Sequence, residues 1–70
     1  MNSRKEQLDT LIDRSNIPMK EIAKRMDVDY STFWRYRQNP EKMRVGQVIR
    51  LAEIIGVNKD AILKIIGKYA

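Results

Sequence analysis

Apolar residues recur at intervals of three and four along nearly the whole chain. This spacing places side chains on one face of an α-helix. The sequence has no sustained alternation of apolar and polar residues and no Asn-Gly or Asp-Gly pair, which are the patterns typical of strands and hairpins. It therefore predicts an all-α fold. Two of the periodic groups are Leu8, Leu11 and Ile12, and Ile22, Ala23 and Met26.

Prolines and glycines divide this periodic sequence into five short helices. Pro18 suits the first turn of a helix, where its missing N–H costs nothing. Asn39 precedes Pro40 and so avoids the helical region, which ends a helix there. Gly56 suits the left-handed residue that follows a helix. The predicted helices run from about Ser3 to Arg14, from Pro18 to Met26, from Tyr30 to Gln38, from Arg44 or Val45 to Ile55, and between Asn58 and Gly67.

Polar side chains stand at three of the predicted helix starts, where they can accept hydrogen bonds from exposed backbone N–H groups. Ser3 or Asn2 is expected to cap the first helix. Asp29 is expected to cap the third helix through its side chain, and Asn58 the fifth. These caps support the predicted boundaries independently of the apolar spacing.

The composition excludes several classes of protein. A chain of 70 residues supports one small domain, and the sequence contains neither cysteine nor histidine. Disulfides, a thiolate nucleophile, a zinc finger and a histidine base are therefore excluded. The acidic residues are scattered and form no catalytic pair, so we expect no enzyme activity, cofactor, metal or small-molecule ligand. We find no signal peptide and no apolar run of about 20 residues, so we expect a cytoplasmic protein without a membrane segment.

The basic residues are concentrated in the middle of the sequence. The chain has 14 Lys and Arg against 9 Asp and Glu, a net charge of +5. Residues 28–50 hold five basic side chains and two acidic ones. A basic balance favours a polyanionic partner, most simply nucleic acid. The alternative is a solvated basic face with no partner.

The predicted third helix has two different faces. At 100° per residue, Phe33 and Tyr36 lie on the side that also holds Thr32 and Asp29. Arg35 and Arg37 flank the other side, and this helix has neither an acid nor a lysine. Such a face is rich in groups that hydrogen-bond base edges, contact thymine methyls or bind phosphates. The members of this outward face are Tyr30, Ser31, Trp34 and Gln38.

Two of these assignments have an alternative. Phe33 and Tyr36 already occupy the inner face, so we expect Trp34 to be exposed, although tryptophan in a small domain is more often buried. Arg35 and Arg37 are expected to contact a partner, although single arginines often serve solubility alone.

The run from Ile17 to Tyr36 resembles the helix-turn-helix of the phage repressor and Cro family. The matching positions are Ala23, Met26, Asp27, Val28, Phe33 and Tyr36. Residues 43–57 are similar to the fourth helix of this family, with its Gly-Val ending, and residues 58–63 resemble the fifth. The likeness covers nearly the whole chain. It departs at Asp27, where the family usually has glycine, and at Pro18 and Met19, where threonine and glutamine are common.

The resemblance implies a compact five-helix, lambda-repressor-like DNA-binding domain over residues 1–70. Its helix-turn-helix would span about residues 18–38, with residues 30–38 as the recognition helix. The implied function is that of a sequence-specific transcriptional regulator of Cro or small-repressor type, which reads an operator in double-stranded DNA through the major groove. The implied setting is the nucleoid of a bacterial or phage-infected cell.

The resemblance also assigns residues to this function. The candidates for reading bases are Tyr30, Ser31, Trp34, Arg35 and Gln38. The candidates for phosphate contacts are Lys20, Arg37, Asn39, Lys42 and Arg44.

Members of the family usually bind pseudo-palindromic operators as dimers, so we expect a homodimer at least on DNA. Apolar residues of the last two helices are candidates for the dimer surface, or else they complete the small core. They are Ile54, Ile62, Ile65, Ile66 and Tyr69.

Three other functions are compatible with the sequence. The chain is alternatively the DNA-binding part of a longer repressor, an antitoxin-like regulator that also binds a protein, or a helical protein-interaction module. The last of these would use Trp34 as a hot spot, and its binding would depend weakly on salt.

Overall fold

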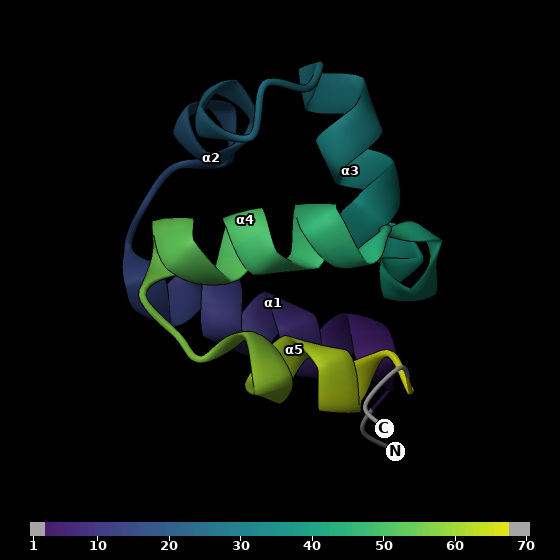
Figure 1. Cartoon of the computed structure of the whole chain (residues 1–70). Helices are drawn as coiled ribbons and strands as arrows, with labels where there is room; N and C mark the ends of the chain where they lie inside the picture. Colours follow the sequence, from purple (N-terminus) through teal and green to yellow (C-terminus); the bar gives the residue numbers. More distant parts are fainter. Residues whose placement is uncertain (1–2, 68–70) are drawn as a thin grey trace.

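Five α-helices and one 3-10 turn make up residues 3–67, the part of the chain that the computed structural model describes. The predicted all-α class is confirmed, and the helix ends agree with the predicted ones to within two residues. The turn η1 was not predicted. The elements are α1 (Arg4–Ser15), α2 (Met19–Arg25), α3 (Tyr30–Gln38), η1 (Pro40–Lys42), α4 (Val45–Ile55) and α5 (Lys59–Ile65), shown in Figure 1.

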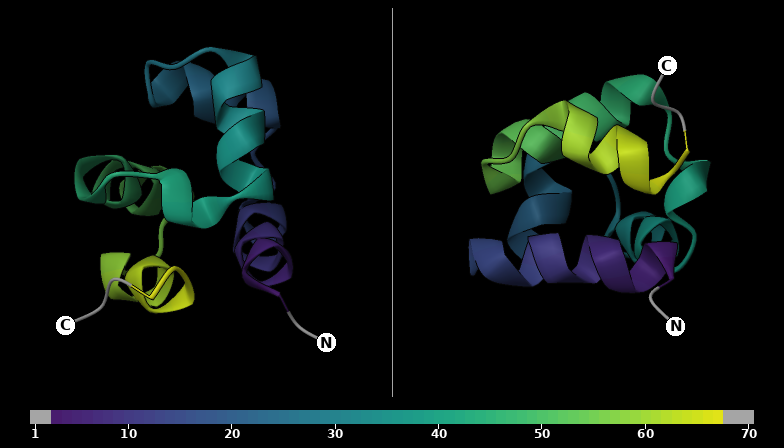
Figure 2. Two further views of the ribbon diagram at one scale, coloured as in Figure 1. Left: turned by 90° about the vertical axis from the view of Figure 1, so that its right-hand side faces the viewer. Right: turned by 90° about the horizontal axis from the view of Figure 1, so that it is seen from below.

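Helix α4 lies across the middle of the molecule (Figure 1). It contacts α5 and α1 on one side and α2 on the other. Helix α2 is seen nearly end-on in the same view, whereas α3 lies in the plane of the picture, so the two axes cross steeply. Figure 2 (left) shows α3 with no other ribbon in front of it. One long side of α3 is therefore left uncovered by the other helices.

The core draws apolar side chains from every α-helix, and the segment between η1 and α4 adds Met43. Their burial supplies the main free energy that holds the helices together, because short helices are marginal in isolation. The core residues are Leu8, Ile12, Ile22, Ala23, Met26, Phe33, Met43, Val48, Leu51, Ala52, Ile55, Ile62, Leu63 and Ile66.

Three predicted helix ends are confirmed. The Ser3 hydroxyl accepts a hydrogen bond from the Glu6 N–H, and the Glu6 carboxylate accepts one from the Ser3 N–H, both at 3.2 Å. The Asn58 side chain accepts from the Asp60 N–H at 2.8 Å. Gly56 has a φ of 76°, the left-handed conformation that glycine adopts without strain.

The predicted side-chain cap at Asp29 is wrong. Its backbone has the extended conformation of an N-cap, with φ −66° and ψ 151°, but its carboxylate accepts no hydrogen bond from α3. Asp29 is exposed. The extended backbone places this carboxylate near the helix end but does not oblige it to bond there, and water solvates it instead.

The predicted dimer surface needs correction. Ile62 and Ile66 are buried in the core, at 0% and 3% exposure, and so face no partner. Ile54 and Ile65 are half-buried at the surface against this core. Tyr69 lies outside the described residues. The spread of these residues around the helices arises because α5 contacts both α1 and α4 and so buries two of its sides.

A carboxylate on α1 binds two cations and ties α1 to α3. One carboxylate oxygen of Asp9 lies 2.8 Å from an Arg37 guanidinium nitrogen, and the other lies 2.7 Å from the Lys5 ammonium. Burial alone would raise the pKa of Asp9, but the hydrogen bonds from Lys5 and Arg37 outweigh it and hold this pKa below its ordinary value. Asp9 therefore stays ionised and keeps the C-terminal half of α3 against α1.

Asp9→Asn is expected to lower the free energy of unfolding by about 1–3 kcal/mol at pH 7, because Arg37 loses its charged partner. A carboxyl group with a lowered folded pKa stabilises the fold above its unfolded pKa, and this contribution is lost as the pH falls through the folded pKa. The difference between the wild type and Asp9→Asn should therefore shrink below about pH 4. Denaturant unfolding at pH 7 and at pH 3 measures it.

Asp13→Asn is the matched control, because Asp13 reaches the same Arg37 only at 3.8 Å and its side chain is 75% exposed. An exposed ion pair of this kind contributes within about 1 kcal/mol. Equal losses for the two variants at pH 7 would contradict the role given to Asp9.

Candidate nucleic-acid interface

A tight turn connects α2 to α3. The Asp27 N–H donates to the Lys24 carbonyl at 3.0 Å, and the Val28 N–H donates to the Ala23 carbonyl at 3.1 Å. This pair of bonds is a Schellman motif, whose pivot residue is left-handed. Asp27 is that residue, with a φ of 60°. Ala23 is buried below it, where a larger side chain would separate the two helices.

The two faces of α3 are divided as the sequence predicts. Phe33 is fully buried, whereas Trp34 is 50% exposed and Tyr30 is 48% exposed. The predicted exposure of Trp34 is thus confirmed. Ser31 and Arg35 are exposed and Gln38 is half-buried. The structure therefore brings the five candidate base-reading residues onto one accessible side of α3.

A side-chain bridge joins α3 to the start of α4. The Gln47 amide donates to the Tyr36 hydroxyl at 2.7 Å, and its oxygen accepts from the Arg44 N–H at 3.0 Å. The Tyr36 ring is half-buried against the core, and its hydroxyl reaches the surface, where Gln47 binds it. The bridge places the first turn of α4 at a set position beside α3.

Exposed basic and polar side chains surround the C-terminal half of α3. Arg35 and Lys42 line a hollow of about 380 Å³, together with Thr32, Tyr36 and Asn39. None of these lining residues is acidic. Arg35, Lys42 and Arg44 form no ion pair with any acid in residues 3–67. The hollow therefore offers positive charge and hydroxyl and amide groups to an anion.

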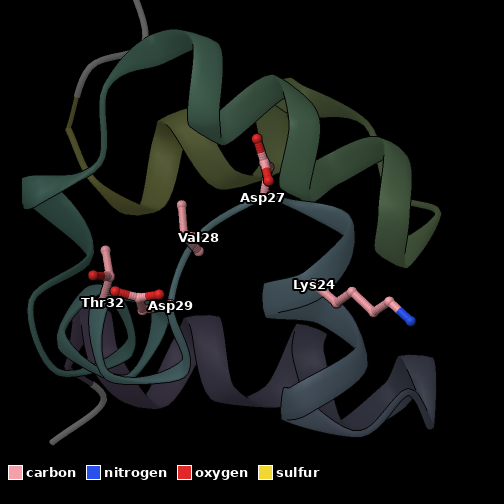
Figure 3. A pocket seen from close by; sticks show the side chains of 5 residues that line it. All are labelled: Lys24, Asp27, Val28, Asp29 and Thr32. Atoms are coloured by element: carbon pink, nitrogen blue, oxygen red, sulfur yellow. The ribbon is translucent and has the colours of Figure 1, made fainter.

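The N-terminal end of α3 has the opposite charge. A second hollow, of about 450 Å³, lies at the turn before α3 (Figure 3). Asp29 and Thr32 lie close together in it, Asp27 projects from the turn, and Lys24 extends away from the others. Two carboxylates at this end repel a phosphate, so an anion approaching α3 is favoured at the side of Arg35 and Lys42.

Arg37 does not join the other predicted phosphate contacts. Its side chain is 16% exposed and its guanidinium is bound to Asp9. The sequence does not indicate this ion pair, because the carboxylate that binds Arg37 belongs to α1, 28 residues earlier in the chain. The remaining candidates, Lys20, Asn39, Lys42 and Arg44, are exposed. Lys20 is in the first turn of α2, apart from the hollow beside Arg35.

Three residues to which the sequence assigned no contact with a partner belong to this region. Thr32 lines both hollows, Tyr36 lines the basic one, and Gln47 holds Tyr36. Thr32 was assigned to the inner face of the helical wheel, although helical spacing also places it one turn before Tyr36. Nothing in the local sequence pairs Gln47 with Tyr36, because the two lie on different helices.

Comparison with protein-family models, with curated proteins and with solved structures yields no match for this chain. No group of three or more side chains able to hold a metal ion occurs within residues 3–67. None of the helices in that range combines the length and the apolar character needed to cross a membrane.

Proposed function

We propose that this protein is a sequence-specific regulator of Cro or small-repressor type, which binds double-stranded DNA with α3 in the major groove. The observation that carries the proposal is the outward side of α3. It holds accessible aromatic, hydroxyl, amide and guanidinium groups, it has no acid, and exposed cations lie beside it. Two half-exposed aromatic rings grouped on one face of a helix are typical of a binding surface.

The dimensions of α3 support this role. A helix with its side chains is about 10–12 Å across and so fits the major groove, which is about 12 Å wide, and the nine residues of α3 extend about 14 Å, the rise of roughly four base pairs. The Schellman turn and the steep crossing of α2 and α3 support a helix-turn-helix over about residues 18–38. In the proposed complex, Arg35 pairs with a guanine and Gln38 with an adenine, while Ser31 hydrogen-bonds a base edge or sugar.

Phosphates are proposed to lie at the basic hollow and the start of α4. Arg44 stands at the N-cap of α4, an 11-residue helix whose dipole adds positive charge at that end. Lys42 and Asn39 lie between this point and α3. The bridge through Gln47 fixes the start of α4 relative to α3, so the residues proposed to contact phosphates keep a constant distance from those proposed to contact bases. Lys20 extends the contacts on the α2 side.

Arg44→Ala is expected to weaken binding about equally on every DNA sequence. Loss of one phosphate contact also lowers the slope of log affinity against log salt by roughly one. The measurement is a salt titration of the dissociation constant. Lys59→Ala is the control, since it removes the same charge from the first turn of α5, which packs on α1 and α4. An unchanged slope for Arg44→Ala, or an equal change for Lys59→Ala, would contradict the phosphate role.

Gln38→Ala is expected to relax the preference at a single base pair, because the bidentate pair with adenine N6 and N7 is lost. The wild type should lose about fivefold or more in affinity when that A·T pair is replaced, and Gln38→Ala should not. Competition binding with single-pair variants of the preferred duplex measures this. A uniform loss of affinity on all duplexes would instead indicate that Gln38 contacts the sugar-phosphate backbone of the DNA.

The whole proposal is tested by selection from a random pool of duplex DNA, followed by a salt titration of the enriched sequence. We expect a defined site whose affinity falls steeply with salt. We also propose a homodimer on DNA, which predicts a pseudo-palindromic site with half-sites about one helical turn apart. Absence of any enriched duplex would refute the proposed function.

A second candidate function is a protein-interaction module, because the exposed Trp34 and Tyr30 also suit a hot spot in a partner's groove. Such binding needs no basic surroundings, and its affinity depends weakly on salt. The antitoxin-like alternative combines both activities, and it predicts a protein partner besides the selected duplex.

A further inference from the structure

Two exposed aromatic rings lie one turn apart on the outward side of α3. Tyr30 and Trp34 are separated by four residues, so both side chains leave the helix on the same face. Each has about half of its surface in contact with water, and only Val45 joins them among the large exposed apolar residues of the described chain. The pair forms a small apolar patch on the outward side of α3, whose other members carry hydroxyl, amide and guanidinium groups.

The tyrosine ring is held at its polar end. The Tyr30 hydroxyl donates a weak hydrogen bond to the Met19 sulfur of α2 at 3.9 Å. The contact adds a thioether, itself apolar and polarisable, to the edge of the patch. It also engages the hydroxyl with α2, so the ring presents its carbon surface to an approaching partner. The tryptophan ring has one donor, its indole N–H, and is otherwise carbon.

We propose that Tyr30 and Trp34 recognise the C5-methyl groups of pyrimidines in the major groove, those of thymine and of 5-methylcytosine alike. The inference rests on the proposed DNA-binding function and specifies its target. In the major groove the C5-methyl is the apolar group on the base-pair edges, so it is the group that an aromatic surface distinguishes best. Arg35, the exposed neighbour of Trp34 in the helix, adds a positive charge that suits duplex DNA.

The spacing of the rings fits neighbouring base pairs. Four residues of helix advance about 6 Å, and base pairs rise by about 3.4 Å. The two rings therefore reach methyl groups on base pairs one or two steps apart. Single-stranded DNA is the less favoured partner, because stacking needs open ring faces along a groove, and the two rings here share one convex helix face.

The test exchanges thymine for deoxyuridine, which removes the methyl group and nothing else. The probe is the duplex enriched from the random pool, remade with each thymine replaced in turn, and also with each cytosine replaced by 5-methylcytosine. We expect one or two thymines per half-site whose replacement weakens wild-type binding about fourfold each. We expect 5-methylcytosine to strengthen binding of a matched cytosine-containing duplex by a similar factor.

Variants of Trp34 test whether its indole ring causes the difference in affinity between thymine and deoxyuridine duplexes. At the thymine that Trp34 contacts, Trp34→Ala should bind the thymine duplex and the deoxyuridine duplex with equal affinity. Trp34→Phe should retain part of the difference. Thermal unfolding of both variants verifies that they are folded. Because the sequence contains a single tryptophan, its fluorescence also reports whether the indole leaves water on binding.

Three outcomes would overturn the inference. Equal wild-type affinity for thymine and deoxyuridine at every position refutes methyl recognition and leaves the DNA-binding function intact. If the protein binds the single strand more strongly than the duplex, the rings stack on unpaired bases and do not recognise methyl groups in the major groove. Absence of any duplex binding removes both the inference and the proposed function.

Discussion

Phe33→Ala is expected to lower the free energy of unfolding by about 3–5 kcal/mol, the cost of deleting a fully buried aromatic ring and leaving a cavity. Phe33 is completely inaccessible to solvent. A chain of 70 residues typically has a total stability of about 4–10 kcal/mol, so the variant should be largely unfolded or close to it. Urea denaturation followed by circular dichroism measures the loss.

The neighbouring residue supplies the control. Trp34→Ala removes a larger ring that leaves the same helix about 100° away from Phe33, and half of that ring already contacts water. We expect a loss of about 1–2 kcal/mol from its buried half. The order of the two losses therefore tests the rotation of α3 about its axis. A larger loss for Trp34 than for Phe33 would mean that the proposed reading face points into the core.

Arg35→Ala is expected to weaken binding to the preferred duplex by about 1–3 kcal/mol, or roughly 5- to 150-fold. Arg35 is exposed on the outward side of α3, and it forms no ion pair within residues 3–67. In the proposed complex its planar guanidinium bonds the O6 and N7 of one guanine. The loss should vanish on a duplex in which that G·C pair is already replaced. Fluorescence anisotropy with the two duplexes measures the difference.

Arg35→Lys separates base reading from charge. Lysine keeps the positive charge but lacks the planar pair of donors that matches guanine. If Arg35 reads a base, Arg35→Lys should lose most of the discrimination at that pair while keeping the salt slope. Full retention of affinity and discrimination in Arg35→Lys would instead assign Arg35 to a phosphate at the basic hollow that it shares with Lys42.

The accuracy of the sequence predictions depends on the range of the interactions involved. The bounds of α3 are as predicted, because Pro40 and the turn around Asp27 act through their own backbone. The exposure of Trp34 is also as predicted, because helical geometry fixes its direction relative to Phe33. The predicted side-chain cap at Asp29 is wrong, because the N-cap backbone conformation does not oblige the carboxylate to accept a hydrogen bond from the helix end.

The candidate interface was partly predictable for the same reason. The outward side of α3 is a property of one helix, and the helical wheel places Tyr30, Ser31, Trp34 and Gln38 on it with Arg35 flanking, in agreement with their accessibility in the structure. The role of Arg37 and the bridge from Gln47 to Tyr36 were missed, because each depends on a second helix. Likewise, Ile62 and Ile66 are core residues only because α5 packs on both α1 and α4.

The sequence by itself determined the five helices, their ends and the faces of α3, because spacing, proline and glycine act over distances of a few residues. Only the tertiary structure decided which charges remain available to a partner. It bound Arg37 to Asp9 of α1, and it left Arg35, Lys42 and Arg44 without acidic partners among residues 3–67. Whether a cation is engaged depends on what lies within a few ångströms of it, and that is set by the packing of helices distant in the chain.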